Sequence, residues 1–127
     1  MVGTGADANG LHATCACGAV SISVPRKPDF INDCNCSLCT KLGATWAYYA
    51  PNEVVVDESG LDSFTRPEMA DPWIRNYRCR TCGCVTHWRS IRPIDPARSG
   101  VNANLFEPEA IQGIEVRHPD GRSWPLE

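Results

Sequence analysis

Cys15-Ala16-Cys17-Gly18 stands near the start of this chain, and Cys79-Arg80-Thr81-Cys82-Gly83 follows roughly sixty residues later. Each stretch places two cysteines on a turn that ends in glycine, which tolerates the left-handed backbone angles that let a chain fold back. Thiolates bind zinc in a tetrahedron at about 2.3 Å, so two such pairs can make one closed, four-ligand site. We therefore predict one structural zinc that ties the two turns together, held by Cys15, Cys17, Cys79 and Cys82.

A third cluster, Cys34-Asn35-Cys36-Ser37-Leu38-Cys39, supplies three thiolates and no evident fourth ligand. A zinc with three protein ligands keeps an open position, at which a substrate can bind or be activated. We predict a second, labile or catalytic zinc held by Cys34, Cys36 and Cys39. Two alternatives remain: the eighth cysteine, Cys84, completes a closed site, or the cluster is a set of metal-free reactive thiols. Cys84 fits better as a buried small apolar residue, the usual role of an unpaired cysteine.

The bulk properties bound the kind of protein this is. A length of 127 residues suits one domain, and we expect residues 11–127 to form it after a flexible tail at 1–10. Neither a secretory signal nor a membrane-spanning run is visible, which favours a cytoplasmic protein, where disulfides are rare. The close spacing of the cysteines also favours metal over disulfides, although an iron–sulfur cluster uses cysteines too.

The charge argues mildly against a nucleic-acid partner, because the net charge is −3 and such partners select a basic face. One stretch departs from this average: Trp73 to Arg92 contains five arginines and no acid. These arginines are expected to offset the negative charge of thiolate-bound metal. A face for an acidic partner is the alternative.

The chain is punctuated by ten glycines and ten prolines, and its apolar residues alternate over short runs. This pattern predicts an all-β domain of short strands with little helix. We expect strands at 11–16, 20–24, 30–35, 45–50, 54–56, 61–65 and 101–105, and a hairpin formed by 73–79 and 85–91. Single helical turns are expected at 37–42 and 109–112.

His12 and His87 stand close to cysteine clusters in the sequence, so either could approach a metal, but neither has ligand-type spacing to a partner histidine. Core or surface positions are expected for the three histidines, His12, His87 and His118. Core positions are expected for the aromatic residues Trp46, Tyr48, Tyr49, Trp73 and Trp88.

The order C-x-C-G, C-x-C-x-x-C and C-x-x-C-G, followed by a tryptophan-bearing strand, resembles the glutathione-dependent formaldehyde-activating family, which includes CENP-V-type domains. The resemblance runs from about Leu11 to Leu105 and matches seven cysteines. It implies an Mss4-like, folded-over sheet of antiparallel strands stabilised by zinc. It also implies the same two ligand sets, with the second zinc at the active site. Asn35, Thr40 and Cys84 depart from the residues that are common in the family.

The resemblance implies a carbon–sulfur lyase or synthase that joins glutathione and formaldehyde into S-hydroxymethylglutathione. Its partners would be a small thiol and a small electrophile, with Lys41 and Arg89 as candidates to receive the thiol's carboxylates. The alternatives are a non-catalytic zinc-stabilised module that binds protein or nucleic acid, and a metal or redox sensor that uses the middle thiolates. The sequence does not indicate an oligomeric state.

Overall fold

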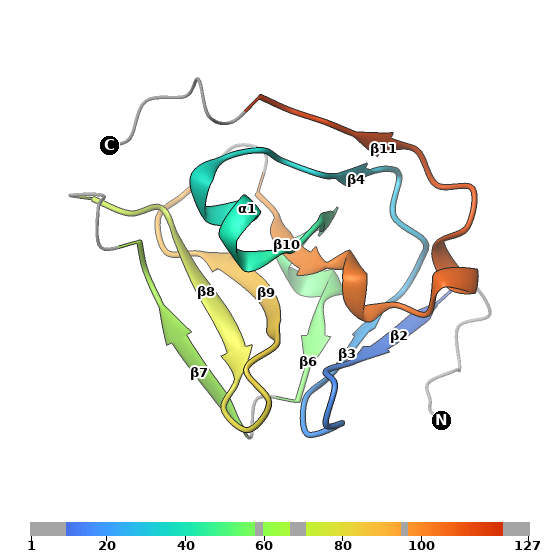
Figure 1. Ribbon diagram of the computed structural model, residues 1–127, viewed down its shortest axis with the longest axis horizontal. Coiled ribbons are helices and arrows are strands. Elements are labelled where there is room, and N and C mark those ends of the chain that lie inside the picture. The colour runs from blue at the N-terminus through green and yellow to red at the C-terminus, as the bar shows by residue number, and fades with distance from the viewer. Residues whose placement is uncertain (1–9, 58–59, 67–70, 95–96, 121–127) are drawn as a thin grey trace.

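Two β-sheets form the framework of the protein in a computed structural model, which describes residues 10–57, 60–66, 71–94 and 97–120 (Figure 1). The expected tail at 1–10 lies outside the described residues, apart from Gly10. The smaller sheet has the spatial order β2 (Leu11–Thr14), β3 (Ser21–Val24) and β6 (Val55–Val56). The larger sheet has the order β11 (Val116–Arg117), β4 (Ile31–Asn32), β5 (Trp46–Tyr49), β10 (Ser99–Asn102), β9 (Val85–Ser90), β8 (Ile74–Cys79) and β7 (Leu61–Phe64).

Helical structure in the described residues is short and lies in the connections between strands. The only α-helix in the described part of the chain is α1 (Ser37–Leu42), which contains Cys39 and is capped by Cys36. Three 3₁₀ turns accompany it: η1 (Pro51–Glu53), η2 (Ala103–Leu105) and η3 (Pro108–Ile111). The predicted all-β class with little helix is therefore confirmed.

Three expectations about individual elements need correction. The predicted strand at 101–105 ends at Asn102, whose side chain accepts a hydrogen bond from the Asn104 backbone and begins a 3₁₀ turn. The predicted strand at 30–35 contains only two residues in the sheet, Ile31 and Asn32. Trp73 is 42% exposed instead of lying in the core, and the guanidinium of Arg92 covers its ring at 5.3 Å.

The main hydrophobic core lies between the two sheets, because it draws side chains from both of them. Ala13, Ile22 and Val24 come from the smaller sheet, while Ala47 and Val101 come from the larger one. A separate cluster of Ala44, Trp46 and Trp88 packs with residues of α1. This second cluster supports the helix that carries Cys39.

The order of the larger sheet brings distant parts of the chain together at one edge. β11 pairs with β4 in parallel, an exception to the expected antiparallel arrangement. Backbone hydrogen bonds continue this pairing beyond the strands: Asp33 N–H donates to the Arg117 oxygen at 2.7 Å, and Asn35 N–H donates to the Pro119 oxygen at 3.3 Å. The segment after β11 therefore runs beside the start of the middle cysteine cluster.

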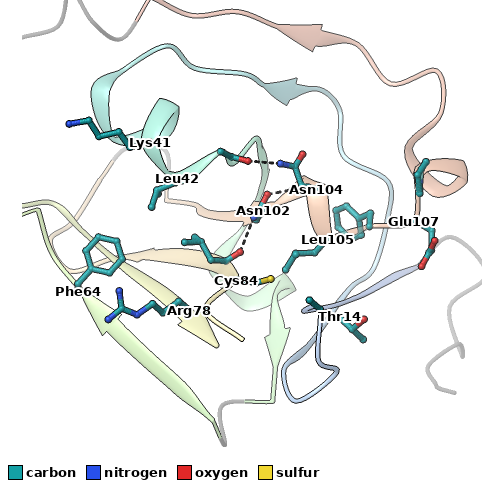
Figure 2. Close-up of a pocket in the computed structure, with 16 residues that line it drawn as sticks. Thr14, Lys41, Leu42, Phe64, Arg78, Cys84, Asn102, Asn104, Leu105 and Glu107 are labelled. Atoms are coloured by element: carbon teal, nitrogen blue, oxygen red, sulfur yellow. Dashed lines mark hydrogen bonds between the residues drawn. The ribbon is translucent and has the colours of Figure 1, made fainter. Parts of the chain in front are cut away.

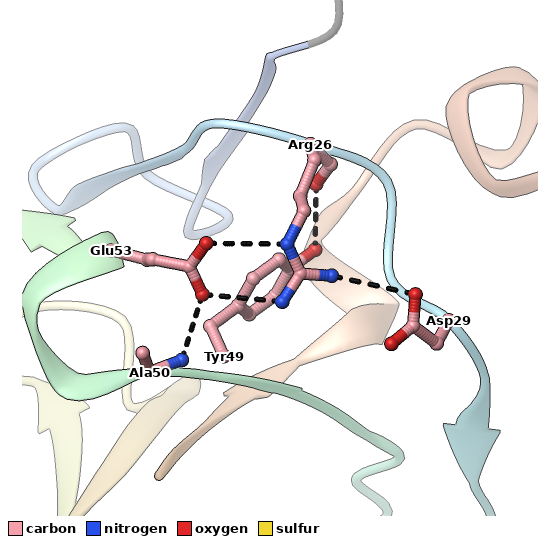
Figure 3. Close-up of polar contacts among 5 residues, drawn as sticks. All are labelled: Arg26, Asp29, Tyr49, Ala50 and Glu53. Atoms are coloured by element: carbon pink, nitrogen blue, oxygen red, sulfur yellow. Dashed lines mark hydrogen bonds and ion pairs between the residues drawn. The ribbon is translucent and has the colours of Figure 1, made fainter.

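A polar clamp holds the chain between β3 and β4 to the end of β5 (Figure 3). The Arg26 guanidinium donates from Nε and Nη2 to the two carboxylate oxygens of Glu53, both at 3.2 Å. Glu53 also accepts the Ala50 backbone N–H at 2.8 Å, and the Tyr49 hydroxyl donates to the Arg26 backbone oxygen at 3.1 Å. The hydrogen bonds from Arg26 and Ala50 lower the pKa of the Glu53 carboxyl. The clamp thus joins two connections that neither sheet holds by itself.

Candidate metal centres

The first candidate centre brings together the four cysteines of the Cys15–Gly18 and Cys79–Gly83 stretches. The sulfurs of Cys15, Cys17, Cys79 and Cys82 all lie within 4.8 Å of one another. The Sγ atoms of Cys15 and Cys17 are 3.7 Å apart, and those of Cys17 and Cys79 are 3.6 Å apart. A tetrahedron of thiolates at about 2.3 Å from zinc has edges of about 3.8 Å. The four residues therefore fit a zinc ion in both number and spacing.

The two turns are shaped so that backbone amides face these sulfurs. Val20 N–H donates to the Cys15 sulfur at 3.3 Å, and Cys82 N–H donates to the Cys79 sulfur at 3.4 Å. Gly18 and Gly83 adopt left-handed backbone angles, with φ values of 81° and 82°, as the sequence predicted. Hydrogen bonds of this kind stabilise thiolates and orient them toward a metal. They favour a closed centre that joins the β2–β3 turn to the β8–β9 turn.

The second candidate centre is built by the short helix α1 and the turn before it. The sulfurs of Cys34, Cys36 and Cys39 lie within 4.8 Å of one another, and no fourth histidine, cysteine or carboxylate in the described ranges joins them. Cys36 caps the helix by accepting the Cys39 N–H at 3.3 Å. The Trp46 indole N–H donates to the Cys39 sulfur at 3.4 Å. The group fits a zinc with three protein ligands and one open position.

Local charges and hydrogen bonds distinguish Cys36 from the other two cysteines of this group. Burial acts to raise the pKa of its thiol, but hydrogen bonds from the Cys39 thiol and backbone, together with the nearby Arg66 charge, outweigh burial and lower it. Burial raises the pKa of Cys34 and of Cys39. Cys36 is therefore the thiol of this group that loses its proton most readily before any metal binds.

Tyr48 lies on β5 near the same cysteines. Its phenol oxygen accepts a hydrogen bond from Asn32 Nδ2 at 2.9 Å. Burial, with a further contribution from Cys39 and Cys34, raises its pKa. The phenol therefore keeps its proton, and that proton is available to donate because the oxygen already accepts from Asn32.

Two cavities formed by described residues lie near the helix, and the smaller of these two is lined by cysteines of the second centre. This cavity of about 410 Å³ is bounded by Cys34 and Cys39, by Asp33, and by His118 from the segment after β11. Its size falls in the range of small-molecule sites. We take it as the candidate substrate pocket.

The larger cavity, a groove of about 750 Å³, lies beside the end of the helix, where Lys41 and Leu42 line it (Figure 2). Leu42, Arg78 and Cys84 line it, but none of the cysteines of the second centre does. The Asn104 amide donates to the Gly43 backbone oxygen at 2.7 Å, and Gly43 borders both cavities. This hydrogen bond fixes the position of Gly43 between the two cavities.

Several residues considered from the sequence lie away from the second centre. Cys84 packs beside the buried cluster of Cys15, Val20 and Cys79, so its proposed role as a fourth ligand to the middle cysteines is wrong. It is half-buried and lines the larger groove. Lys41 lines that groove as well.

The three histidines take three different positions. His12 is exposed, and its Nδ1 lies 3.1 Å from the Ser23 hydroxyl on β3. His87 is completely buried. His118 is exposed at the rim of the smaller cavity, where Asp33 lies 3.6 Å from its Nδ1. Nothing in the spacing of the sequence indicated that Asp33 and His118 meet, because the β4–β11 pairing creates their contact.

These features define a class of protein: a two-sheet β fold that carries one four-cysteine centre and one open three-cysteine centre. The chain belongs to the family described as glutathione-dependent formaldehyde-activating enzyme, whose model matches residues 10–115.

A solved structure is similar to this chain in sequence and fold. The crystal structure of a Rhodobacter sphaeroides protein is 27% identical in sequence, with a TM-score of 0.65, and the match covers 84% of this chain and 99% of that one. No curated protein matches the chain significantly. Within the described residues, no helix has the length and apolar character needed to cross a membrane.

Proposed function

We propose that the protein is a zinc-dependent carbon–sulfur lyase or synthase acting on a small thiol adduct. Glutathione and formaldehyde are the proposed reactants, and S-hydroxymethylglutathione is their product. The observation that carries the proposal is the second centre: three cysteine sulfurs within 4.8 Å of one another, beside a cavity of about 410 Å³. Membership of the family supports the choice of reactants.

The two cysteine groups would serve different purposes. Cys15, Cys17, Cys79 and Cys82 would hold a structural zinc, and Cys34, Cys36 and Cys39 would hold the second one. A zinc bound by three thiolates supplies a Lewis acid that lowers the pKa of a thiol and polarises a carbonyl. The protein's own contribution is to hold thiol and electrophile together in the cavity, since proximity removes much of the entropic cost of joining two molecules.

The residues around the cavity suit this chemistry. The Trp46 and backbone N–H donors orient the cysteine sulfurs, as donors behind metal ligands generally do. Tyr48 on β5 lies near the cysteine sulfurs, and its phenol retains its proton because its pKa is raised. Arg66 places positive charge near Cys36, which favours an anionic thiol over a neutral one.

The experiment that tests the proposal compares Cys36→Ser with Cys84→Ser, a control that removes a thiol from outside the second centre. Cys36→Ser should lose about one zinc per chain, keep its melting temperature within a few degrees and lose turnover in a glutathione–formaldehyde exchange assay. Cys84→Ser should retain both metals and the activity. Turnover in Cys36→Ser equal to that of wild type would rule out the zinc mechanism.

The binding-module alternative receives no specific support from the described residues. Three of the five arginines between Trp73 and Arg92 are engaged within the fold: Arg75 donates to the Ser63 hydroxyl, Arg80 pairs with Asp62 and Arg92 pairs with Asp71. These contacts tie β8 and the turns at its ends to neighbouring segments. Tight binding of nucleic acid at physiological salt would nevertheless restore this alternative.

A further inference from the structure

We propose that His118, oriented by Asp33, is the proton-transfer residue of the three-cysteine pocket. The inference rests on the proposed function, because it assigns a role within the same site. It also adds a residue that lies beyond the 10–115 range of the family match.

The position of His118 is set by backbone pairing and not by a free loop. β11 lies parallel to β4 in the register Val116 with Ile31 and Arg117 with Asn32. The Asp33 and Asn35 amides extend the pairing past His118, to the oxygens of Arg117 and Pro119. The Asn35 side chain donates to an Asp120 carboxylate oxygen at 2.9 Å. Hydrogen bonds on both sides of His118 therefore hold its backbone at the rim of the cavity.

The chemistry of the ring suits this position. Asp33 Oδ2 lies 3.6 Å from His118 Nδ1, so the carboxylate favours the tautomer with the proton on Nδ1 and leaves the Nε2 lone pair available. A histidine base that is oriented by a carboxylate is a common arrangement for proton transfer to and from a reacting thiol.

Among the residues that the structure describes, the charged groups around His118 are few. Asp33 faces His118 from the segment after β4. Asp120 lies on the same segment as His118 and accepts a hydrogen bond from the Asn35 side chain. Arg117 is directed elsewhere, since its guanidinium pairs with Glu115 at 3.1 Å and lies 3.8 Å from the centre of the Phe30 ring. Cys34 and Cys39 are the acidic groups on the other walls.

The step balances without an oxidant or a reductant. The thiol S–H bond breaks as its proton passes to His118 Nε2, and the sulfur lone pair forms the S–C bond to the aldehyde carbon. The carbonyl π electrons move to oxygen, which takes the proton back from the imidazolium to give the hydroxyl group. In the reverse direction the same ring removes the hydroxyl proton and returns it to sulfur.

The test counts the protons released when glutathione binds to the zinc-loaded protein. Calorimetric titrations at about pH 7.5, in two buffers of different ionisation enthalpy, give this number without turnover. In wild type the thiol proton should remain on the protein. In His118→Gln about one additional proton per bound thiol should reach the buffer. His12→Gln is the matched control, because it makes the same substitution at another exposed histidine, and it should behave as wild type.

Turnover provides the second measurement. His118→Gln should lower the exchange rate above background by about 10²-fold or more while both zincs stay bound, and Asp33→Asn should lower it less. Equal proton counts in wild type and His118→Gln, with thiol binding intact, overturn the role of His118 and leave the proposed function standing. Loss of the second zinc in His118→Gln would make the imidazole a metal ligand and also overturn it. Failure of wild type to bind glutathione overturns both proposals.

Discussion

The buried His87 predicts a specific loss of stability in mild acid. The side chain is fully buried on β9, where its ring stacks on Tyr77 with 4.6 Å between centroids. Its Nδ1 lies 2.8 Å from the Thr86 hydroxyl, and its Nε2 has no hydrogen-bond partner among the described residues. Protonation would place a charge and a second donor in this apolar site. Burial, with a smaller contribution from Arg89, therefore lowers the pKa of His87 to about 4.

The sign and the size of the effect follow from this pKa. The folded-state pKa lies below the unfolded value of about 6.5, so the unfolded chain takes up the proton first as the pH falls. The contribution of neutral His87 to the free energy of unfolding is complete above about pH 6.5, and it is lost progressively as the pH falls toward 4. Between about pH 7 and pH 5 the linkage relation gives a loss of about 2 kcal/mol from this one residue.

The assay measures the free energy of unfolding by urea denaturation at both pH values, for wild type and for His87→Gln. Protonation of the cysteine thiolates weakens both proteins alike, so the difference between their two losses isolates His87. His87→Gln should lose about 2 kcal/mol less than wild type over this interval. His12→Gln, an exposed control, should follow wild type. Equal losses in wild type and His87→Gln would refute the argument from burial.

Three further predictions concern the framework. Cys79→Ser should yield mostly unfolded or insoluble protein, because zinc bound by such a set contributes on the order of 10 kcal/mol; a folded, zinc-free variant with a normal melting curve would exclude a structural metal. Gly100→Ala should cost about 1–3 kcal/mol in urea denaturation, because the new Cβ would overlap the indole packed on that position. Gly60→Ala, where a Cβ meets nothing within 4 Å, is its control, and equal losses in the two variants would count against the overlap. Arg26→Met should cost about 1 kcal/mol, and a double-mutant cycle with Glu53→Gln should show coupling; strictly additive losses would mean that their ion pair contributes nothing.

Sequence reasoning predicted the features that depend on local chemistry. The Cys79–Cys82 turn was predictable because closely spaced cysteines before a glycine have few other uses, and the hairpin around it because its flanking residues favour strands. The end of β10 was missed, because Asn102 interrupts a run of apolar residues through a side-chain cap that composition does not reveal. Trp73 was misplaced, since an aromatic residue beside a strand is usually buried and here an arginine covers it.

A different reason explains why the contact between Asp33 and His118 at the rim of the pocket could not be predicted. Asp33 and His118 are far apart in sequence, and each is unremarkable by itself. Their contact depends on a parallel pairing of two-residue strands, and such short strands leave no periodic pattern in the sequence. The three cysteines of the second centre were grouped correctly, whereas the cavity beside them became apparent only from the fold.

The pairing of β11 with β4 has a practical consequence for anyone who shortens this protein. A gene truncated after residue 115, where the family match ends, would encode all seven clustered cysteines and, of the strands described here, all except β11 (Figure 1). Such a product would contain every cysteine of both centres and would look like a complete domain by its sequence. It would nevertheless lack the wall of the smaller cavity that His118 and Pro119 form. Domain boundaries taken from shared sequence can therefore cut through a site that the three-dimensional pairing of strands completes.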